Sequence, residues 1–342
     1  MRVLVLGVDW HGDVAPALCR GFQSRGIEAV PRHLLIQRRR ALRPRIEDEL
    51  LSSSLGPAIR RLHERRALAA TRSAVASVAP DLTVCLAPEL MPAPAIELAA
   101  EAAEVCWWFA DDPLSFARRR LPGPPPVLDH IATRGGRAFV AHPAWARGPL
   151  AAATYLPYGA RYEPDLPAYA DPHPRRGCAV VGSPRRERAE LLAPIAAALG
   201  TELSVWGWGA RGRLPSNAAT KPFRASLRGW GVAPPGRTET IYRSAAVVLN
   251  LQDPQMLGAW NPQTFDLMGL GVPQVVWNRD PVAALENPPP FASAPEELVE
   301  LVKGFLRDPP PVDALKAAFE EVRARHRWRH RAEAITAVAR VG

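Results

Sequence analysis

A polar stretch in the last third of the chain combines the residue types that bind a phosphate group. In residues 257–276, Asn261, Pro262 and Thr264 mark the start of a short helix, and Asp266 lies about one turn inside it. The free N–H groups and positive end of a helix form a site for a diphosphate, and a carboxylate there can accept hydrogen bonds from ribose hydroxyls. The alternative is a helix capped by Asn261 with Pro262 in its first position and Asp266 exposed to solvent.

A second candidate is the turn Gly182-Ser183, which follows a short apolar stretch and precedes an arginine-rich segment. Small residues allow the backbone to approach a ligand closely. Arg185 or Arg186 would then neutralise the negative charge of a bound diphosphate. The alternative is the start of a surface helix whose arginines are solvated.

Two polar residues follow the first apolar stretch, residues 3–7. His11 or Asp13 is placed to contact an acceptor or a donor sugar, and a histidine that titrates near neutral pH can act as a base. The alternative is a turn in which Asp13 caps the next helix.

The elements that must position these residues follow a repeating pattern of short apolar runs and helical stretches, which is typical of parallel β-α-β units. In the first half, strands are expected at 3–7, 27–30, 82–86, 105–109, 130–133, 138–141 and 154–156, and helices at 14–26, 46–79 and 93–103. In the second half, strands are expected at 179–181, 203–206, 246–251 and 274–277, and helices at 185–199, 264–269, 296–306 and 312–340.

The proline-rich segment 159–176 interrupts this pattern and is interpreted as a linker. The prediction is an α/β protein with an N-terminal Rossmann-like domain at 1–158 and a C-terminal Rossmann-like domain at 177–325. A terminal helix at 326–342 is expected to pack back on the first domain. Two such domains imply a cleft between them, and ligands bind at the carboxyl ends of parallel strands.

The order of these motifs resembles the GT-B glycosyltransferases of the GT4 type, and more narrowly the branch typified by the spore-maturation protein CgeB. The resemblance rests on residues 107–113, 156–159, 162–164, 181–186, 206–209, 241–244, 249–250 and 257–276. It implies a GT-B fold in which domain 1–158 lies on the acceptor side and domain 177–325 binds the nucleotide sugar. It also implies a donor site formed by Gly182, Ser183, Arg185, Trp230, Gly231, Val232, Asn261, Pro262, Gln263, Thr264 and Asp266. Catalytic roles are expected for His11, Asp13 and Arg186.

The chain departs from the family pattern at two positions. Asp266 stands where a glutamate is commoner, and Gly258 stands where many retaining relatives have a second glutamate that engages the donor sugar. The resemblance implies transfer of a sugar, with retention of configuration, from a UDP- or GDP-linked donor to an unidentified acceptor. The nucleotide sugar is a substrate and no cofactor is expected. The alternatives are a non-catalytic nucleotide- or polyanion-binding protein on the same scaffold, and a sugar-nucleotide epimerase.

Asp111-Asp112-Pro113 superficially resembles the metal-binding carboxylates of the other glycosyltransferase class, GT-A. Asp112 before a proline is more simply a helix N-cap, so we expect no metal site and assign Asp111 an acceptor contact. His326 and His330 lie four residues apart, but the neighbouring arginines would repel a zinc ion.

The chain has 342 residues and a net charge of +9, from 43 basic and 34 acidic side chains, which favours an anionic partner. Five arginines in the run 38–45 either contact an anionic membrane peripherally or form a solvated loop. Nucleic acid is not an expected partner, because basic and aromatic residues do not alternate along a stripe. The four cysteines are scattered, and no apolar run reaches the roughly 18 residues of a membrane span. The N-terminus is unlike a signal peptide. These features predict a cytoplasmic protein.

Overall fold

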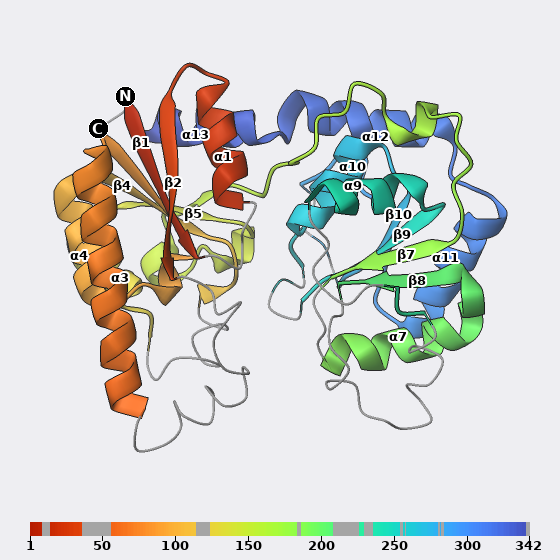
Figure 1. Cartoon of the computed structure of the whole chain (residues 1–342), viewed down its shortest axis with the longest axis horizontal. Coiled ribbons are helices and arrows are strands. Elements are labelled where there is room, and N and C mark those ends of the chain that lie inside the picture. Colours follow the sequence, from red (N-terminus) through yellow and green to blue (C-terminus); the bar gives the residue numbers. More distant parts are fainter. Residues whose placement is uncertain are drawn as a thin grey trace. The chain divides into compact units, whose positions relative to one another are not determined.

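The chain forms two compact units in a computed structural model (Figure 1). The first comprises Met1–Tyr158 and Trp328–Gly342, and the second comprises Gly159–Arg327. The residues that the structure describes are 1–8, 14–35, 56–113, 124–182, 186–207, 226–228, 235–253, 256, 258–279, 281 and 284–339. The segment 159–176, predicted to be a linker, belongs to the second unit, and the C-terminal helix belongs to the first.

The first unit is built on a six-stranded sheet with the order β2-β1-β3-β4-β5-β6, in which all neighbouring strands are parallel. Its strands are β1 (Arg2–Val8), β2 (Glu28–Leu35), β3 (Leu82–Leu86), β4 (Glu104–Phe109), β5 (Arg137–Val140) and β6 (Thr154–Tyr155). Strand β3 is buried along its whole length, as expected for an apolar strand covered on both faces of a parallel sheet.

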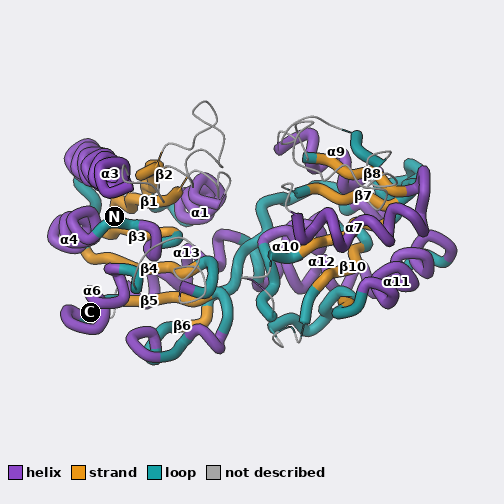
Figure 2. The backbone as a smooth tube through the Cα atoms, turned by 90° about the horizontal axis from the view of Figure 1, so that it is seen from below, coloured by secondary structure: helices purple, strands orange, loops and turns teal. Residues whose placement is uncertain are grey.

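Helices cover both faces of this sheet (Figure 2). One face carries α1 (Val14–Gln23) and α13 (Trp328–Ala339), which pack against each other. The other carries α3 (Gly56–Val78), α4 (Ala93–Ala102) and α6 (Pro126–Arg134). Short 3₁₀ turns, η2 (Pro88–Leu90), η3 (Pro143–Trp145) and η4 (Gly148–Leu150), complete the unit.

One sequence prediction in this unit was wrong. The strand expected at 130–133 is part of helix α6, because Pro126 is suited to the first helical turn and Val127, Leu128 and Ile131 form a buried stripe at helical spacing. The helical stretch expected at 312–340 consists of two helices, α12 (Val312–Arg325) in the second unit and α13 in the first, with His326 and Arg327 between them. The break allows the chain to pass from the second unit back to the first.

The second unit is built on a five-stranded parallel sheet with the order β11-β10-β9-β7-β8. The strands are β7 (Cys178–Val181), β8 (Leu203–Trp206), β9 (Val247–Leu251), β10 (Gln274–Trp277) and β11 (Phe291–Ala292). The helices are α7 (Arg186–Leu199), α9 (Pro235–Ser244), α10 (Pro262–Leu270), α11 (Pro295–Arg307) and α12, with the 3₁₀ turns η5 (Ala168–Ala170) and η6 (Gly200–Glu202).

Strand β9 shows how this sheet divides two hydrophobic cores. Val247, Leu249 and Leu251 pack with residues of α7 and α11 on one face, whereas Val248 packs with residues of α9 and α10 on the other. Side chains of a strand alternate between the two faces of its sheet. Asn250 therefore faces α10 from the middle of an apolar strand.

Each sheet has one point where the strand order reverses. In the second unit the chain goes from β7 outward to β8 and then returns to place β9 on the other side of β7. In the first unit the reversal lies between β1 and β3. Ligands of open parallel sheets bind at the carboxyl ends of the strands at such a switch point. Among the helices of the described residues, none is both long enough and apolar enough to span a bilayer.

Candidate functional site

Seven of the predicted site residues lie outside the described residues: His11, Asp13, Ser183, Arg185, Trp230, Gly231 and Val232. Arg186 is the first residue of α7, and its side chain also lies outside the description. The remaining predicted residues fall at the carboxyl edges of the two sheets. Gly182 and the start of α10 are in the second unit, and Asp111 is in the first.

Gly182 follows β7 at the switch point and provides room for an arginine. A Cβ atom at this position would lie 2.9 Å from Nη1 of Arg188, so a side chain there would displace the guanidinium group. Gly207, after β8, also lies close to Gly182, because its Cβ would be 2.7 Å from the Gly182 carbonyl oxygen. Glycine at 182 therefore leaves space for the Arg188 guanidinium group, and glycine at 207 allows the two backbones to approach closely.

Arg188 links α7 to the end of β9. Its Nη2 atom donates to the Leu251 carbonyl oxygen at 2.9 Å and pairs with Oδ1 of Asp253 at 3.0 Å. The guanidinium group therefore holds the backbone at residues 251–253 beside the turn after β7. The sequence prediction considered Arg185 and Arg186 and missed Arg188, although its position in the first turns of the same helix was the available signal.

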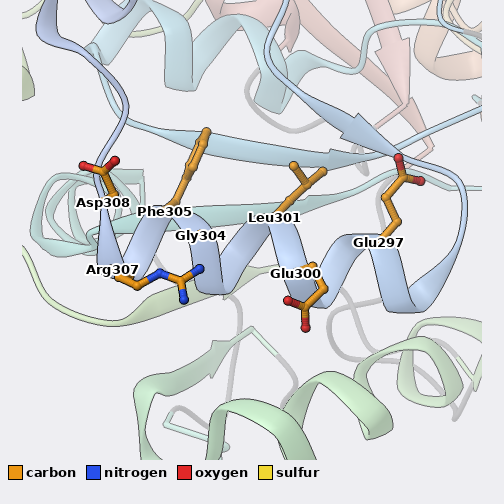
Figure 3. A pocket seen from close by; sticks show the side chains of 7 residues that line it. All are labelled: Glu297, Glu300, Leu301, Gly304, Phe305, Arg307 and Asp308. Carbon is orange, nitrogen blue, oxygen red and sulfur yellow. The ribbon is translucent and has the colours of Figure 1, made fainter.

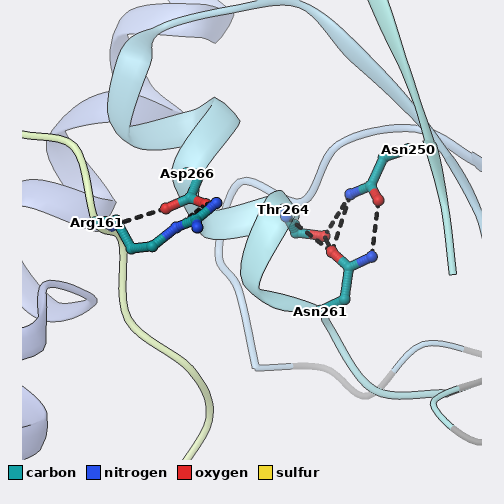
Figure 4. A network of polar contacts seen from close by, with 5 residues as sticks. All are labelled: Arg161, Asn250, Asn261, Thr264 and Asp266. Atoms are coloured by element: carbon teal, nitrogen blue, oxygen red, sulfur yellow. Dashed lines mark hydrogen bonds and ion pairs between the residues drawn. The ribbon is translucent and has the colours of Figure 1, made fainter. Parts of the chain in front are cut away.

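The start of α10 is fixed by a network of buried amide side chains (Figure 4). Asn250 and Asn261 bond reciprocally, with Nδ2 of Asn261 donating to Oδ1 of Asn250 at 2.7 Å and Nδ2 of Asn250 donating back at 3.1 Å. Nδ2 of Asn250 also contacts Oγ1 of Thr264 at 3.0 Å and Oε1 of Gln274 at 3.2 Å. Asn250 was missed as a site residue, and the signal was a polar residue within an apolar strand.

Asn261 is the N-cap of α10 and Pro262 occupies its first position. The side chain of Asn261 accepts a hydrogen bond from the Thr264 backbone N–H at 2.9 Å. The part of the alternative interpretation in which Asn261 caps this helix and Pro262 occupies its first position is therefore confirmed. Because Pro262 has no N–H group and that of Thr264 is occupied, the first turn offers a ligand mainly the Gln263 N–H and the positive end of the helix dipole.

The loop before α10 is held from the neighbouring strand by Asn278. Oδ1 of Asn278 accepts from the N–H groups of Gly258 at 2.7 Å and Arg279 at 2.8 Å, and its Nδ2 donates to the Ala259 carbonyl at 2.9 Å. Gly258 has a φ of 92°, a backbone conformation that favours glycine. Gly258 thus has a local structural reason to be glycine.

Asp266 is fully buried and paired with Arg161, which lies early in the second unit (Figure 4). Its Oδ1 accepts from the Arg161 backbone N–H at 2.7 Å, and its Oδ2 accepts from Nε at 2.8 Å and Nη2 at 2.5 Å. Despite burial, the charge of Asp266 and these hydrogen bonds raise the pKa of Arg161 above its ordinary value. A ribose contact at Asp266, as predicted from the sequence, would require this ion pair to open.

At the carboxyl edge of the first sheet, two acidic residues are buried. Glu89, in the turn after β3, is 1% exposed, and Asp111, after β4, is 3% exposed. Burial, and secondly the charge of Asp111, raises the pKa of Glu89 well above its ordinary value. Tyr158 lies in the same group, because burial and then the charges of Asp111 and Glu89 raise its pKa. Among the described residues, no other side chain or backbone group bonds to the carboxyl oxygens of Glu89.

Asp112 pairs with Arg147, with Oδ2 and Nη2 3.1 Å apart. In the described part of the chain, no three or more His, Cys, Asp or Glu side chains are grouped as metal ligands. A metal-independent reaction stays a prediction.

Two surface hollows of the second unit lie elsewhere. One, of about 530 Å³, runs along α11 and is lined by Glu297, Glu300, Leu301, Gly304, Phe305, Arg307 and Asp308 (Figure 3). The other, of about 500 Å³, is lined mostly by residues just before β7, β8 and β9, at the amino edge of the sheet, together with Ser204 of β8 and Leu306 of α11. Neither is lined by the carboxyl-edge residues described above.

Residues 185–337, slightly under half of the chain, match the family model described as Glycosyl transferase-like. No curated protein matches the sequence. Sucrose-phosphate synthase from Thermosynechococcus elongatus has a similar structure, with a TM-score of 0.63, 13% identity and coverage of 99% of this chain and 98% of that one.

Two further solved structures are similar over the whole chain. The glycosyltransferase SnogD from Streptomyces nogalater has a TM-score of 0.52 and 14% identity, with 99% of each chain covered. UDP-GlcNAc 2-epimerase from Neisseria meningitidis, bound to UDP-GlcNAc, has a TM-score of 0.57 and 12% identity, with 100% of each chain covered. The predicted fold is confirmed: two parallel-sheet, Rossmann-like α/β domains that match glycosyltransferases of the GT-B fold. The CgeB-like branch stays a prediction.

Proposed function

We propose that this protein is a GT-B glycosyltransferase that moves a sugar from a nucleotide-diphosphate-sugar donor to an acceptor. The main support is the match of residues 185–337 to the glycosyl transferase-like family, because this range includes α7, β9 and α10. These elements meet at the switch point of the second sheet, where parallel α/β sheets bind their ligands. Fold alone would not justify an activity.

The donor diphosphate is assigned to the starts of α10 and α7. The positive ends of the two helix dipoles favour the negative charge that grows on the diphosphate as the bond from the sugar C1 to the phosphate oxygen breaks. The helix start at Asn261 is held by the paired amides, so it needs no rearrangement as the charge develops. Arg186, at the first position of α7, is the proposed cation.

The proposed reaction retains configuration. The acceptor oxygen bonds to C1 on the face from which the diphosphate departs, and the acceptor proton passes to a phosphate oxygen. His11 and Asp13 are proposed to contact the sugar or the acceptor, and Asp111 the acceptor. Asp266 is not given a role in this scheme, because its carboxylate is occupied by Arg161.

Thermal unfolding in the presence of UDP, GDP and their sugars tests this function. A ligand that binds only the native state stabilises the protein by about 2.7 kcal/mol when its free concentration is one hundred times its Kd. We expect one nucleotide sugar to raise the Tm and to release its nucleoside diphosphate when an acceptor is added. If no nucleotide or nucleotide sugar shifts the Tm, the proposal is wrong.

A sugar-nucleotide epimerase is the second candidate, because the epimerase from Neisseria meningitidis shares the fold over its whole length. Product analysis separates the two activities. A transferase needs an acceptor and forms a new glycosidic bond, whereas an epimerase changes the sugar of its substrate without an acceptor. Salt-dependent retention on nucleic acid with neither reaction would instead support a polyanion-binding protein.

A further inference from the structure

Gln252 is a buried amide without hydrogen-bond partners at the switch point of the second sheet. It is the first residue after β9, and it is 2% exposed. Within the described part of the chain, neither its Oε1 nor its Nε2 atom has a hydrogen-bond partner. A buried polar group left unpaired costs free energy, and each such group in a folded protein requires an explanation.

The position of Gln252 is set by its neighbours on both sides. Nη2 of Arg188 donates to the carbonyl of Leu251 at 2.9 Å and pairs with Asp253 at 3.0 Å. The same guanidinium group lies against Gly182, after β7. Gln252 is therefore held at the junction of β7 and β9, which is the point where the strand order reverses.

The side of the sheet on which Gln252 lies follows from the alternation along β9. Val248 packs with residues of α10, and Asn250 bonds to Asn261 and Thr264 of the same helix start. Continuing with a period of two, Gln252 lies on the same side, toward the start of α10. A second amide nitrogen, Nε2 of Gln263 in the first turn of α10, is also buried without a partner among the described residues.

We propose that Gln252 binds a sugar hydroxyl of the donor, and this inference rests on the proposed function. A carboxamide carries both donors and an acceptor, and a hydroxyl group can satisfy both, whereas a diphosphate oxygen only accepts. The N-terminus of α10 holds the diphosphate, and Gln252 beside it holds a hydroxyl of the attached ribose or of the transferred sugar. The nitrogen of Gln263 supplies a further donor to the same ligand.

The test compares Gln252→Met with Gln274→Met. Gln274 is a buried amide of the same sheet, but its side chain donates to the Thr264 carbonyl at 3.0 Å and accepts from Asn250 at 3.2 Å. Replacing a partnered amide breaks structure, whereas replacing an unpaired one removes an unsatisfied group. Without ligand, we expect Gln252→Met to keep or raise the Tm and Gln274→Met to lower it.

A second experiment measures, by calorimetry, how tightly the wild type and Gln252→Met bind the nucleoside diphosphate and the nucleotide sugar. We expect Gln252→Met to bind the nucleotide sugar about tenfold more weakly, as for the loss of one buried hydrogen bond. Equal weakening for the nucleoside diphosphate identifies the ribose hydroxyl, and weakening for the nucleotide sugar alone identifies the transferred sugar.

Unchanged affinity of Gln252→Met for both ligands overturns the inference and leaves the proposed function in place. A Tm for Gln252→Met that falls as far as that of Gln274→Met shows a structural role and also overturns it. If the wild-type protein binds neither ligand, the proposed function fails, and this inference fails with it.

Discussion

Buried polar side chains at the two sheet edges are of two kinds. Asp266 and Asn250 are paired by several hydrogen bonds, whereas Glu89 and Gln252 have side-chain atoms without partners among the described residues. A paired buried group stabilises the local structure, and a group with unpaired atoms decreases stability. This difference separates the residues that hold the edge from those available to a ligand or a proton.

The first prediction concerns Asp266. We expect Asp266→Asn to lower the free energy of unfolding by about 3 kcal/mol, because it leaves the Arg161 side chain, which is only 20% exposed, without its counter-ion. Urea unfolding of the purified variant measures this change. The matched control is Glu300→Gln, which breaks an exposed pair with Lys303 and should cost less than about 1 kcal/mol.

Replacing both partners, as Arg161→Met with Asp266→Leu, should recover much of this loss, because no buried charge remains. Asp266→Asn would instead support the ribose contact if it kept the stability of the wild type and lost affinity for nucleotides.

The second prediction concerns the pH dependence of stability through Glu89. Burial and the charge of Asp111 raise the pKa of Glu89 well above its ordinary value of 4.5, and Tyr158 is the other titratable group of this cluster. The folded chain therefore keeps a proton that the unfolded chain loses. Stability from this residue is complete below the ordinary pKa and decreases as the pH rises toward the folded-state value.

Glu89→Gln should remove this decrease and be more stable than the wild type at neutral pH, because an amide has no proton to lose. Urea unfolding between pH 4 and pH 8 measures the free energy of unfolding of both proteins. Glu101→Gln, at an exposed glutamate of α4, is the control and should follow the wild-type profile. Parallel profiles for Glu89→Gln and the wild type would contradict the assignment.

At the scale of elements, two glycines allow neighbouring segments to pack closely, because a side chain at either position would meet atoms of the neighbour. In the first unit, Gly21 of α1 lies against the first residues of α13, where a Cβ on Gly21 would lie 2.5 Å from the Trp328 carbonyl oxygen. In the second unit, Gly271 ends α10 with a φ of 67°, and its Cβ would lie 2.6 Å from the ring of Tyr169. The glycine at the end of α10 is therefore explained by a left-handed C-cap.

The third prediction compares two glycines inside helices. Gly21→Ala should destabilise the protein by about 1 to 3 kcal/mol, because α13 must move away from α1 to accommodate the methyl group. Gly304→Ala in α11 is the control. No described atom lies within 4 Å of its Cβ position, so it should stabilise the protein by about 0.5 to 1 kcal/mol. Chemical denaturation of both variants measures the difference, and equal effects would contradict the packing of α13 on α1.

At the scale of the whole molecule, the chain passes between its two units twice. It leaves the first unit after Tyr158 and returns at Trp328. Near these positions the two crossing segments bond to each other: the Ala160 N–H donates to the His326 carbonyl at 2.8 Å, and Arg327 pairs with Glu163 at 2.6 Å. His326 and Arg327 thus form part of the return segment.

The sequence by itself determined the α/β class, two Rossmann-like units and the capped start of α10. These features depend on local patterns: alternating apolar runs and helical stretches, and the preference of Asn and Pro for a helix start. The strand expected at 130–133 was wrong because a short apolar run gives no clear period and Pro126 favoured a helix.

Only the tertiary structure decided which polar residues face one another. Arg161 and Asp266 are separated by 105 residues, and Arg188 and Leu251 by 63, so no local pattern could reveal these pairs. Asp266 was assigned to a ligand from its place in a motif, whereas the fold brings an arginine to it. Conversely, Gln252 carried no motif, and its unpaired amide became visible only once β7, β9 and α10 were brought together at one edge of the sheet.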